Sequence, residues 1–298
     1  MRHMIKGQNI ALSTTRATET SRGWEHVLCS TSLIQHHTVS LKEVNYLFPL
    51  WIEPEGTEER RLPNLSPTLM ASLARDTGLD YQDGLGERQG QLTGIRRQKP
   101  EQISLLTLGR GRGDLENTFG PRDAFDWMYA ILHSPMYRTR YATFLKSEFP
   151  HIPMPNSKAL FVALIPIGTQ LTALHELDVA NAKILSTSSD MRLAGSGVAR
   201  IEKGYPKWAN GRVTINSHRW FEEVPEEAWN FHIGGYRVCE KWLKDRRGRL
   251  LSTDDIELYQ RVVVALRETR RLMTEIDAVI GRHGGWPNAF SVHVGSGD

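Results

Sequence analysis

The 298-residue chain, with 40% hydrophobic and 24% charged residues, has the composition of a globular protein with room for one large domain or two smaller ones. Its two cysteines, Cys29 and Cys239, lack CxxC spacing, which argues against a disulfide framework or a zinc–thiolate site. No apolar run is long enough to cross a bilayer and no signal peptide is recognisable, so we expect a cytoplasmic protein with no membrane contact. The net charge of +3 allows a polyanionic partner without requiring one.

The first third of the chain predicts strands followed by one helix. Strand-like runs lie at residues 9–17, 25–30 and 44–52. Ser66 and Pro67 suit the cap and first turn of a helix that ends near Thr77. Residues 80–118 are rich in Gly, Gln and Arg and show little periodicity, so we expect an insertion there.

The middle of the chain is predicted to be helical. Gly120 and Pro121 begin a helix that Ser134 and Pro135 interrupt, and a second helix is expected from 136 to about 147. A proline-rich connector leads to a long helix over 157–177. Residues 181–197 are the favoured internal boundary because they are rich in Ser, Thr and Ala.

Beyond this boundary, we expect a hairpin of strands 198–203 and 212–216, joined through Asn210 and Gly211. Residues 225–273 predict a strand, a helix, an arginine-rich turn and a second helix, which Ser252 or Thr253 caps. The predicted fold is therefore α+β: a β-rich N-terminal part, a helical middle, and a C-terminal β-hairpin followed by two long helices. The expected parts are 1–180, 181–281 and a loose tail over 282–298.

Long stretches of this sequence are similar in amino-acid sequence to those of one known family, and they follow in the same order along the chain. They include FHIGGYRVCEKWLKDRRGRLLSTDDIELYQRVVVAL at 231–266, the block at 122–155, and segments at 1–17, 23–30 and 46–51. Together they resemble the C-terminal specificity domain of type ISP restriction–modification enzymes, which are single-polypeptide, type I-like systems. The resemblance implies sequence-specific recognition of double-stranded DNA in phage defence, with a methyltransferase domain ending where this chain begins. A truncated gene, a split subunit and an excised fragment all fit.

The motifs of the other activities of that family are missing from the sequence. It has no NPPY-like string for a flipped adenine, no GxxxxGK[ST] loop for ATP, and no persuasive carboxylate cluster of a nuclease. We therefore expect no catalytic residues and no cofactor in this chain, with S-adenosylmethionine, ATP and Mg²⁺ serving only a full-length or partner enzyme. The adjacent residues His36 and His37, and likewise His175 and Glu176, lack the HExxH spacing of a zinc site, so no metal site is predicted.

Two surfaces are candidates for DNA contact. The C-terminal one carries cations interleaved with Tyr205, Trp208 and Trp220, and the N-terminal one carries cations in loops between strands. The residues are Arg200, Lys203, Lys207, Arg212 and Arg219 on the first surface, and Arg16, Arg22 and Lys42 on the second. A solvated hairpin and ordinary exposed loops are the alternatives. The arginines at 246–249 and 267–271 are assigned to helix C-termini.

A glycine- and arginine-rich segment at 109–114 lacks the spacing of a phosphate-binding loop. It is predicted to be a basic loop, with contact to the DNA backbone through Arg110 and Arg112 as the alternative.

Two other functions remain open. The chain fits the recognition half of a split adenine-specific DNA methyltransferase that works with a separate methyltransferase or nuclease subunit. It also fits a repurposed protein–protein interaction module that docks a partner through the helices at 124–145 and 254–280.

Overall fold

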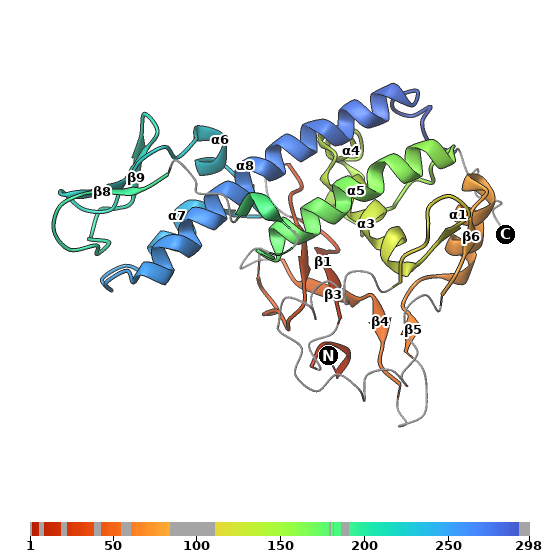
Figure 1. The fold of residues 1–298 in the computed structure, drawn as a ribbon, viewed down its shortest axis with the longest axis horizontal. Helices are drawn as coiled ribbons and strands as arrows, with labels where there is room; N and C mark the ends of the chain where they lie inside the picture. The colour runs from red at the N-terminus through yellow and green to blue at the C-terminus, as the bar shows by residue number, and fades with distance from the viewer. Residues whose placement is uncertain are drawn as a thin grey trace.

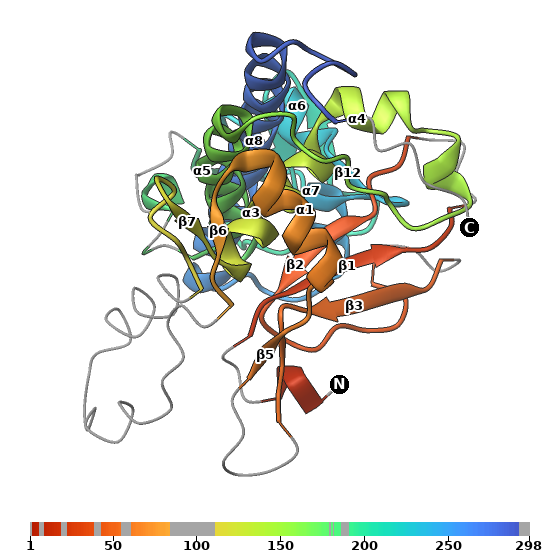
Figure 2. The ribbon, with the colours of Figure 1, turned by 90° about the vertical axis from the view of Figure 1, so that its right-hand side faces the viewer.

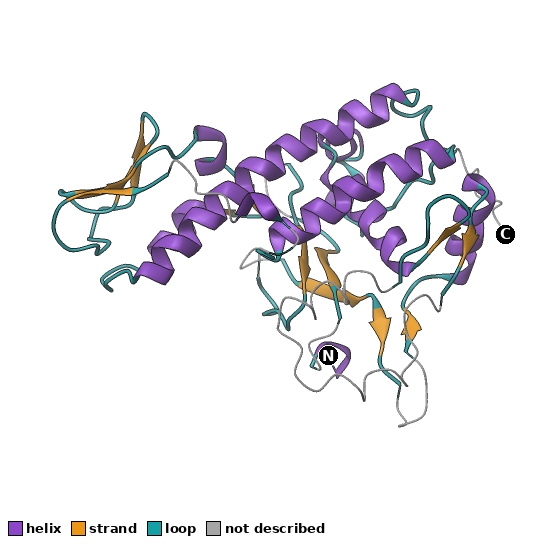
Figure 3. Cartoon of the chain, in the orientation of Figure 1, coloured by secondary structure: helices purple, strands orange, loops and turns teal. Residues whose placement is uncertain are grey.

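The computed structural model describes residues 2–5, 9–18, 23–38, 43–54, 61–83, 111–178, 180, 182–185 and 191–291. Within these ranges the chain forms a larger body and a smaller C-terminal lobe that projects from it (Figure 1). Helices and strands occur in both parts (Figure 3), so the predicted α+β class is confirmed.

The body begins with a three-stranded antiparallel sheet, which lies beneath the helices in Figure 2. Its central strand is β1 (Ala11–Thr15), which lies between β2 (Val27–Ser30) and β3 (Asn45–Pro49). A short helical turn, η1 (Arg2–Met4), precedes β1 in the chain. The strand predicted over 44–52 is interrupted at Leu50, which is buried and donates its N–H to Ile10. The chain then continues as β4 (Trp51–Ile52), paired with β5 (Leu62–Pro63).

Helix α1 (Pro67–Thr77) has the predicted bounds. The Ser66 hydroxyl accepts the N–H of Leu69 at 3.4 Å, and Gly78 ends the helix with a φ of +68°. Strand β6 (Asp80–Tyr81) pairs in parallel with β7 (Thr118–Phe119), so the two ends of the expected insertion lie side by side. Residues 84–110 of that insertion lie outside the described residues.

The core of the body is helical. Helix α3 (Pro121–His133) packs against α5 (Lys158–His175), and the two backbones come close at Gly168. By length and mean hydropathy, 1.3, α5 resembles a membrane-spanning helix, but 56% of it is buried, as expected of a core helix. Helix α4 (Pro135–Arg140) starts one residue before the predicted position and ends earlier, because the chain turns into η3 (Phe144–Lys146) and buries Leu145.

Helix α8 (Thr253–Arg282) joins the two parts of the molecule. Ser252 and Asp255 form a capping box at its start, so Ser252, and not Thr253, is the cap of the two that the sequence allowed. Its first turns contribute Tyr259 and Val263 to the core of the lobe, and its later turns contribute to the core of the body. The segment expected to be a loose tail packs against the body as far as residue 291, with Ala289 and Phe290 buried.

The lobe contains a four-stranded antiparallel sheet in the order β8-β11-β10-β9. The strands are β8 (Leu193–Gly195), β9 (Lys207–Ala209), β10 (Arg212–Thr214) and β11 (Arg219–Phe221). The hairpin turn is at Asn210 and Gly211, as predicted, with φ of +48° and +78°. The predicted partner of β10, a strand over 198–203, is wrong, however. Strand β9 pairs with β10, and residues 199–201 instead form hydrogen bonds with the turn at 248–251.

Short elements connect this sheet to α8. They are α6 (Glu226–Trp229), β12 (His232–Ile233), β13 (Tyr236–Arg237) and α7 (Val238–Lys244), and η4 (Lys183–Leu185) precedes the lobe. Gly234 and Gly235 turn the β12–β13 hairpin. The first of the two C-terminal helices, α7, is 7 residues long, whereas α8 has 30.

Candidate nucleic-acid interface

Positive charge is concentrated in the C-terminal lobe. Residues 191–251 contain twelve Lys and Arg and seven Asp and Glu, a surplus of five positive charges. The whole chain has a net charge of +3, so the remaining residues together carry a net charge of −2. This separation makes the lobe the part of the chain that attracts a polyanion.

The strand register defines the two faces of the lobe sheet. Val213 lies opposite both Phe221 and Trp208, and this inner face covers the core of the lobe. Lys207, Thr214 and Trp220 share the other face, because side chains alternate along each strand and paired residues point the same way. Arg212 lies on this outer face too, two residues before Thr214.

The predicted cations of the lobe fall into different environments. Arg200, Lys203 and Lys207 are exposed and form no ion pair with any described residue, although Lys207 lies over the ring of Tyr205. Arg212 is exposed on the outer face. Arg219 lies on the inner side of the sheet, where its Nη1 donates to the carbonyl of Gly195 at 3.0 Å.

An acidic group missed by the sequence reasoning organises one end of the outer face. Glu222 accepts hydrogen bonds from Trp220 Nε1 at 3.1 Å and from Arg192 Nε at 2.9 Å. Arg212 lies 3.6 Å from the same carboxylate and over the Trp220 ring. These donors hold the pKa of Glu222 below its usual range. Arg192 is 30 residues from Glu222 in sequence, so only the pairing of β8 with β11 brings them together.

The arginine-rich turn between α7 and α8 lies beside residues 199–205. Gly248 donates its N–H to Ile201, and Arg247 Nη2 donates to the carbonyl of Tyr205 at 2.7 Å. Arg246 Nη1 bonds the carbonyl of Trp242 at the end of α7, as expected of a cation at a helix C-terminus. The turn therefore adds the exposed Arg247 to the cationic surface formed by Arg200 and Lys203.

The N-terminal candidate surface is only partly described. Arg16 is exposed directly after β1. Arg22 and Lys42 lie outside the described residues, as does Arg110. Contact between these residues and DNA remains a prediction.

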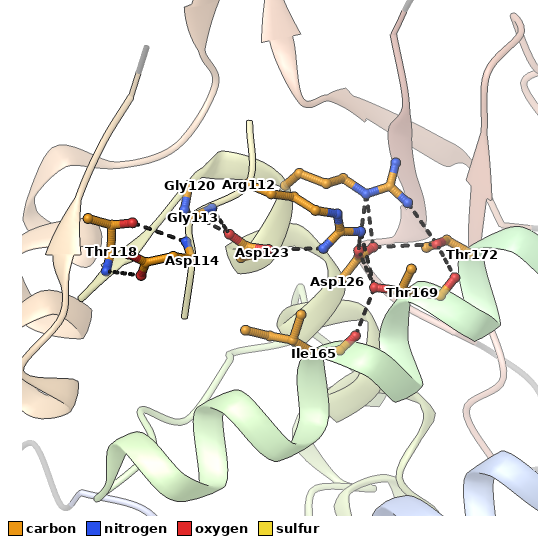
Figure 4. Close-up of polar contacts among 11 residues, drawn as sticks. Arg112, Gly113, Asp114, Thr118, Gly120, Asp123, Asp126, Ile165, Thr169 and Thr172 are labelled. Atoms are coloured by element: carbon orange, nitrogen blue, oxygen red, sulfur yellow. Dashed lines mark hydrogen bonds and ion pairs between the residues drawn. The ribbon is translucent and has the colours of Figure 1, made fainter. Parts of the chain in front are cut away.

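Arg112 lies in the polar network of Figure 4, which connects its loop to α3 and α5. Its guanidinium binds the carboxylates of Asp123, at 2.9 Å, and Asp126, and donates to Thr169 at 3.1 Å. Asp123 also accepts the backbone N–H groups of Gly113 and Gly120. These bonds tie the loop to α3 and α5 and engage the Arg112 guanidinium within the fold. Contact between this loop and a DNA backbone stays a prediction.

The histidines contribute to packing. His133 and His175 lie beside Tyr129 between α3, α5 and α8, and the Tyr129 hydroxyl is 2.6 Å from His175 Nδ1. Burial holds the pKa of His133 well below its usual value and lowers that of His175 to about 4. Among the described residues, no group of three His, Cys, Asp or Glu side chains is arranged to hold a metal ion.

The helices proposed for partner docking are largely occupied by the fold itself. Almost every residue of α3 is buried, and α8 packs against α5 in the body and against α6 and α7 in the lobe. No continuous apolar face of α3 or α8 is left open for a partner, but Met136 and Phe144, which follow α3 within the predicted docking segment 124–145, are exposed.

Solved structures with a similar fold are DNA complexes of much longer chains. The ATP-dependent Type ISP restriction–modification enzyme LlaBIII bound to DNA is 15% identical, with a TM-score of 0.58 over 90% of this chain and 16% of that one. A nuclease-deletion mutant of the Type ISP enzyme LlaGI with a DNA substrate mimic is 17% identical, with a TM-score of 0.54 over 90% and 18%. The DrdV–DNA complex is 16% identical, with a TM-score of 0.56 over 92% and 24%.

No curated protein matches this sequence. The sequence model of one family matches residues 1–275, nearly the whole chain. This match agrees with the resemblance seen in the sequence and with the fold. The chain belongs to the Type ISP C-terminal specificity domain family.

Proposed function

We propose that this chain recognises a specific sequence in double-stranded DNA, as the target-recognition domain of a Type ISP restriction–modification enzyme. Its family and the DNA complexes of similar fold support the proposal. The observation that carries it is the surplus of positive charge in the projecting lobe, while the rest of the chain is net negative. The chain spans about a sixth to a quarter of the length of the proteins in those complexes. The resemblance implies that methylation, translocation and cleavage belong to other parts of such an enzyme.

The mechanism is binding without chemistry in this chain. Exposed cations with no acidic partner among the described residues, such as Arg200, Lys203 and Arg247, contact phosphates and set the position of the lobe on the duplex. Their charge is not neutralised within the fold, so each contact releases counterions and makes affinity depend on salt. Polar side chains on the outer face of the sheet then read base edges, and the rigid core of the lobe holds them in place.

Selection from random duplex DNA with the purified chain tests this proposal, followed by affinity measurements on the selected duplex at several salt concentrations. We expect an enriched motif and an affinity that falls steeply as salt rises. Equal affinity for every sequence would contradict recognition by this chain alone. An enriched motif that appears only when a separate methyltransferase subunit is added would instead favour the split-enzyme alternative.

A further inference from the structure

Three charged groups meet at one end of the lobe sheet. Arg192 directly precedes β8, Arg212 begins β10, and Glu222 directly follows β11. Since β11 runs antiparallel to both neighbours, these positions lie together at the end that carries the β9–β10 turn. Strands of antiparallel sheets enter the grooves of DNA in several classes of DNA-binding protein.

Glu222 is held between the two arginines and has little freedom of its own. Its Oε1 accepts the Trp220 indole N–H and lies 3.6 Å from Arg212, while its Oε2 accepts Arg192 Nε. The side chain of Glu222 is 17% exposed, whereas those of Arg192 and Arg212 are 77% and 60% exposed. The carboxylate is therefore a fixed anchor, and the guanidinium groups remain open to a ligand.

The guanidinium N–H groups that do not bond to Glu222 suit the edge of a base. Arg192 uses its Nε for Glu222, and neither of its two Nη groups bonds to any described residue. Arg212 is restrained by the Trp220 ring and the carboxylate. A restrained guanidinium loses less freedom on binding, and its paired donors match the O6 and N7 acceptors of guanine. Because Glu222 offsets part of their charge, these arginines are less suited to bulk attraction of phosphate than the unpaired cations nearby.

We propose that Arg192 and Arg212, anchored by Glu222, read guanine in the major groove and determine part of the target sequence. This inference rests on the proposed function of the chain. Glu222 acts as a positioning residue, because it contacts DNA only through the arginines that it restrains.

Selection from random duplex DNA is repeated with Arg192→Ala, Arg212→Ala and Glu222→Gln, and each variant is also measured on an unrelated duplex. The first two should each lose the preference for guanine at one position, where discrimination falls roughly 10- to 100-fold. Glu222→Gln should lower the affinity for the selected duplex while affinity for the unrelated duplex stays the same or rises. This opposite response separates positioning from a general effect of charge.

The chain offers a matched control in Glu268, whose carboxylate also contacts two arginines, Arg267 and Arg271, and is 15% exposed. Glu268→Gln makes the same charge change outside the sheet and should leave the motif unchanged. Retention of every guanine preference in both arginine variants, or a Glu222→Gln variant that binds all duplexes more tightly, would overturn the inference and leave the proposed function standing. A wild-type chain that enriches no motif would refute both.

Discussion

The close approach of α3 and α5 makes Gly168 a sensitive point of the fold. A Cβ atom added there would lie 1.9 Å from the backbone oxygen of Asp126 and 2.6 Å from its carbonyl carbon. Ordinary contact begins at 3.4 Å, so the two backbones would have to separate by about 1.5 Å. That movement would also strain the hydrogen bonds that cross between the two helices, from Thr169 to Asp126 and from Arg122 to Thr172.

Gly168→Ala should therefore destabilise the chain. Overpacking costs about 1–3 kcal/mol, strained hydrogen bonds add about 1 kcal/mol, and the better helix propensity of Ala returns up to about 1 kcal/mol. We expect a net loss of about 2 kcal/mol in the free energy of unfolding, measured by urea denaturation and circular dichroism. Gly281→Ala, also in a helix but with no atom within 4 Å of the added Cβ, should be neutral or slightly stabilising. Equal stability of the two variants would refute the reasoning.

Two further predictions concern buried charge. Burial raises the pKa of Glu176 to about 7, so its protonated form stabilises the fold below pH 4.5 and this contribution is lost as pH rises through 7. We therefore expect the free energy of unfolding of Glu176→Gln to rise, relative to that of wild type, by on the order of 2 kcal/mol between pH 5 and 8, as measured by thermal unfolding. If the stability of the two proteins changed in parallel with pH, this prediction would be contradicted. Asp126→Ala leaves the buried Arg122 without its carboxylate and should cost about 3–5 kcal/mol in urea denaturation. Asp245→Ala, which breaks the exposed pair with Lys241, should cost less than about 1 kcal/mol, and similar losses in the two variants would rule out the distinction.

Local signals in the sequence predicted elements whose ends are set by nearby residues. The serine cap of α1, the start of α3 at Pro121 and the Asn210–Gly211 turn were predicted at their observed positions. Ser252, the cap of α8, was one of two predicted candidates, and α4 begins one residue before its predicted start. Each depends on a few neighbouring residues whose backbone preferences are strong. The sheet partner of β10 was missed because strands β8, β9 and β11 are three residues each, too short for their alternation to stand out.

The candidate site was only partly predictable for a related reason. The cations at 200–212 were found because they cluster in sequence. Arg192 and Glu222 meet through strand pairing, and Arg247 joins residues 199–205 through backbone hydrogen bonds, so no local pattern connects them. The segment around Arg112 has the composition of a surface loop, but the partners of Arg112, Asp123 and Asp126, lie on helix α3, which follows the loop in the sequence.

The salt dependence of DNA affinity tests most directly whether the C-terminal lobe binds DNA. Wild type is compared with a variant in which Arg200, Lys203 and Lys207 are all Ala, and with a control in which Arg75, Arg271 and Arg282, which lie outside the sheet, are all Ala. Each lost phosphate contact lowers the slope of log affinity against log salt by about 0.9. We expect the slope to fall by about 2 to 3 in the first variant and to stay at the wild-type value in the control. Equal slopes in all three proteins would contradict DNA binding by the lobe.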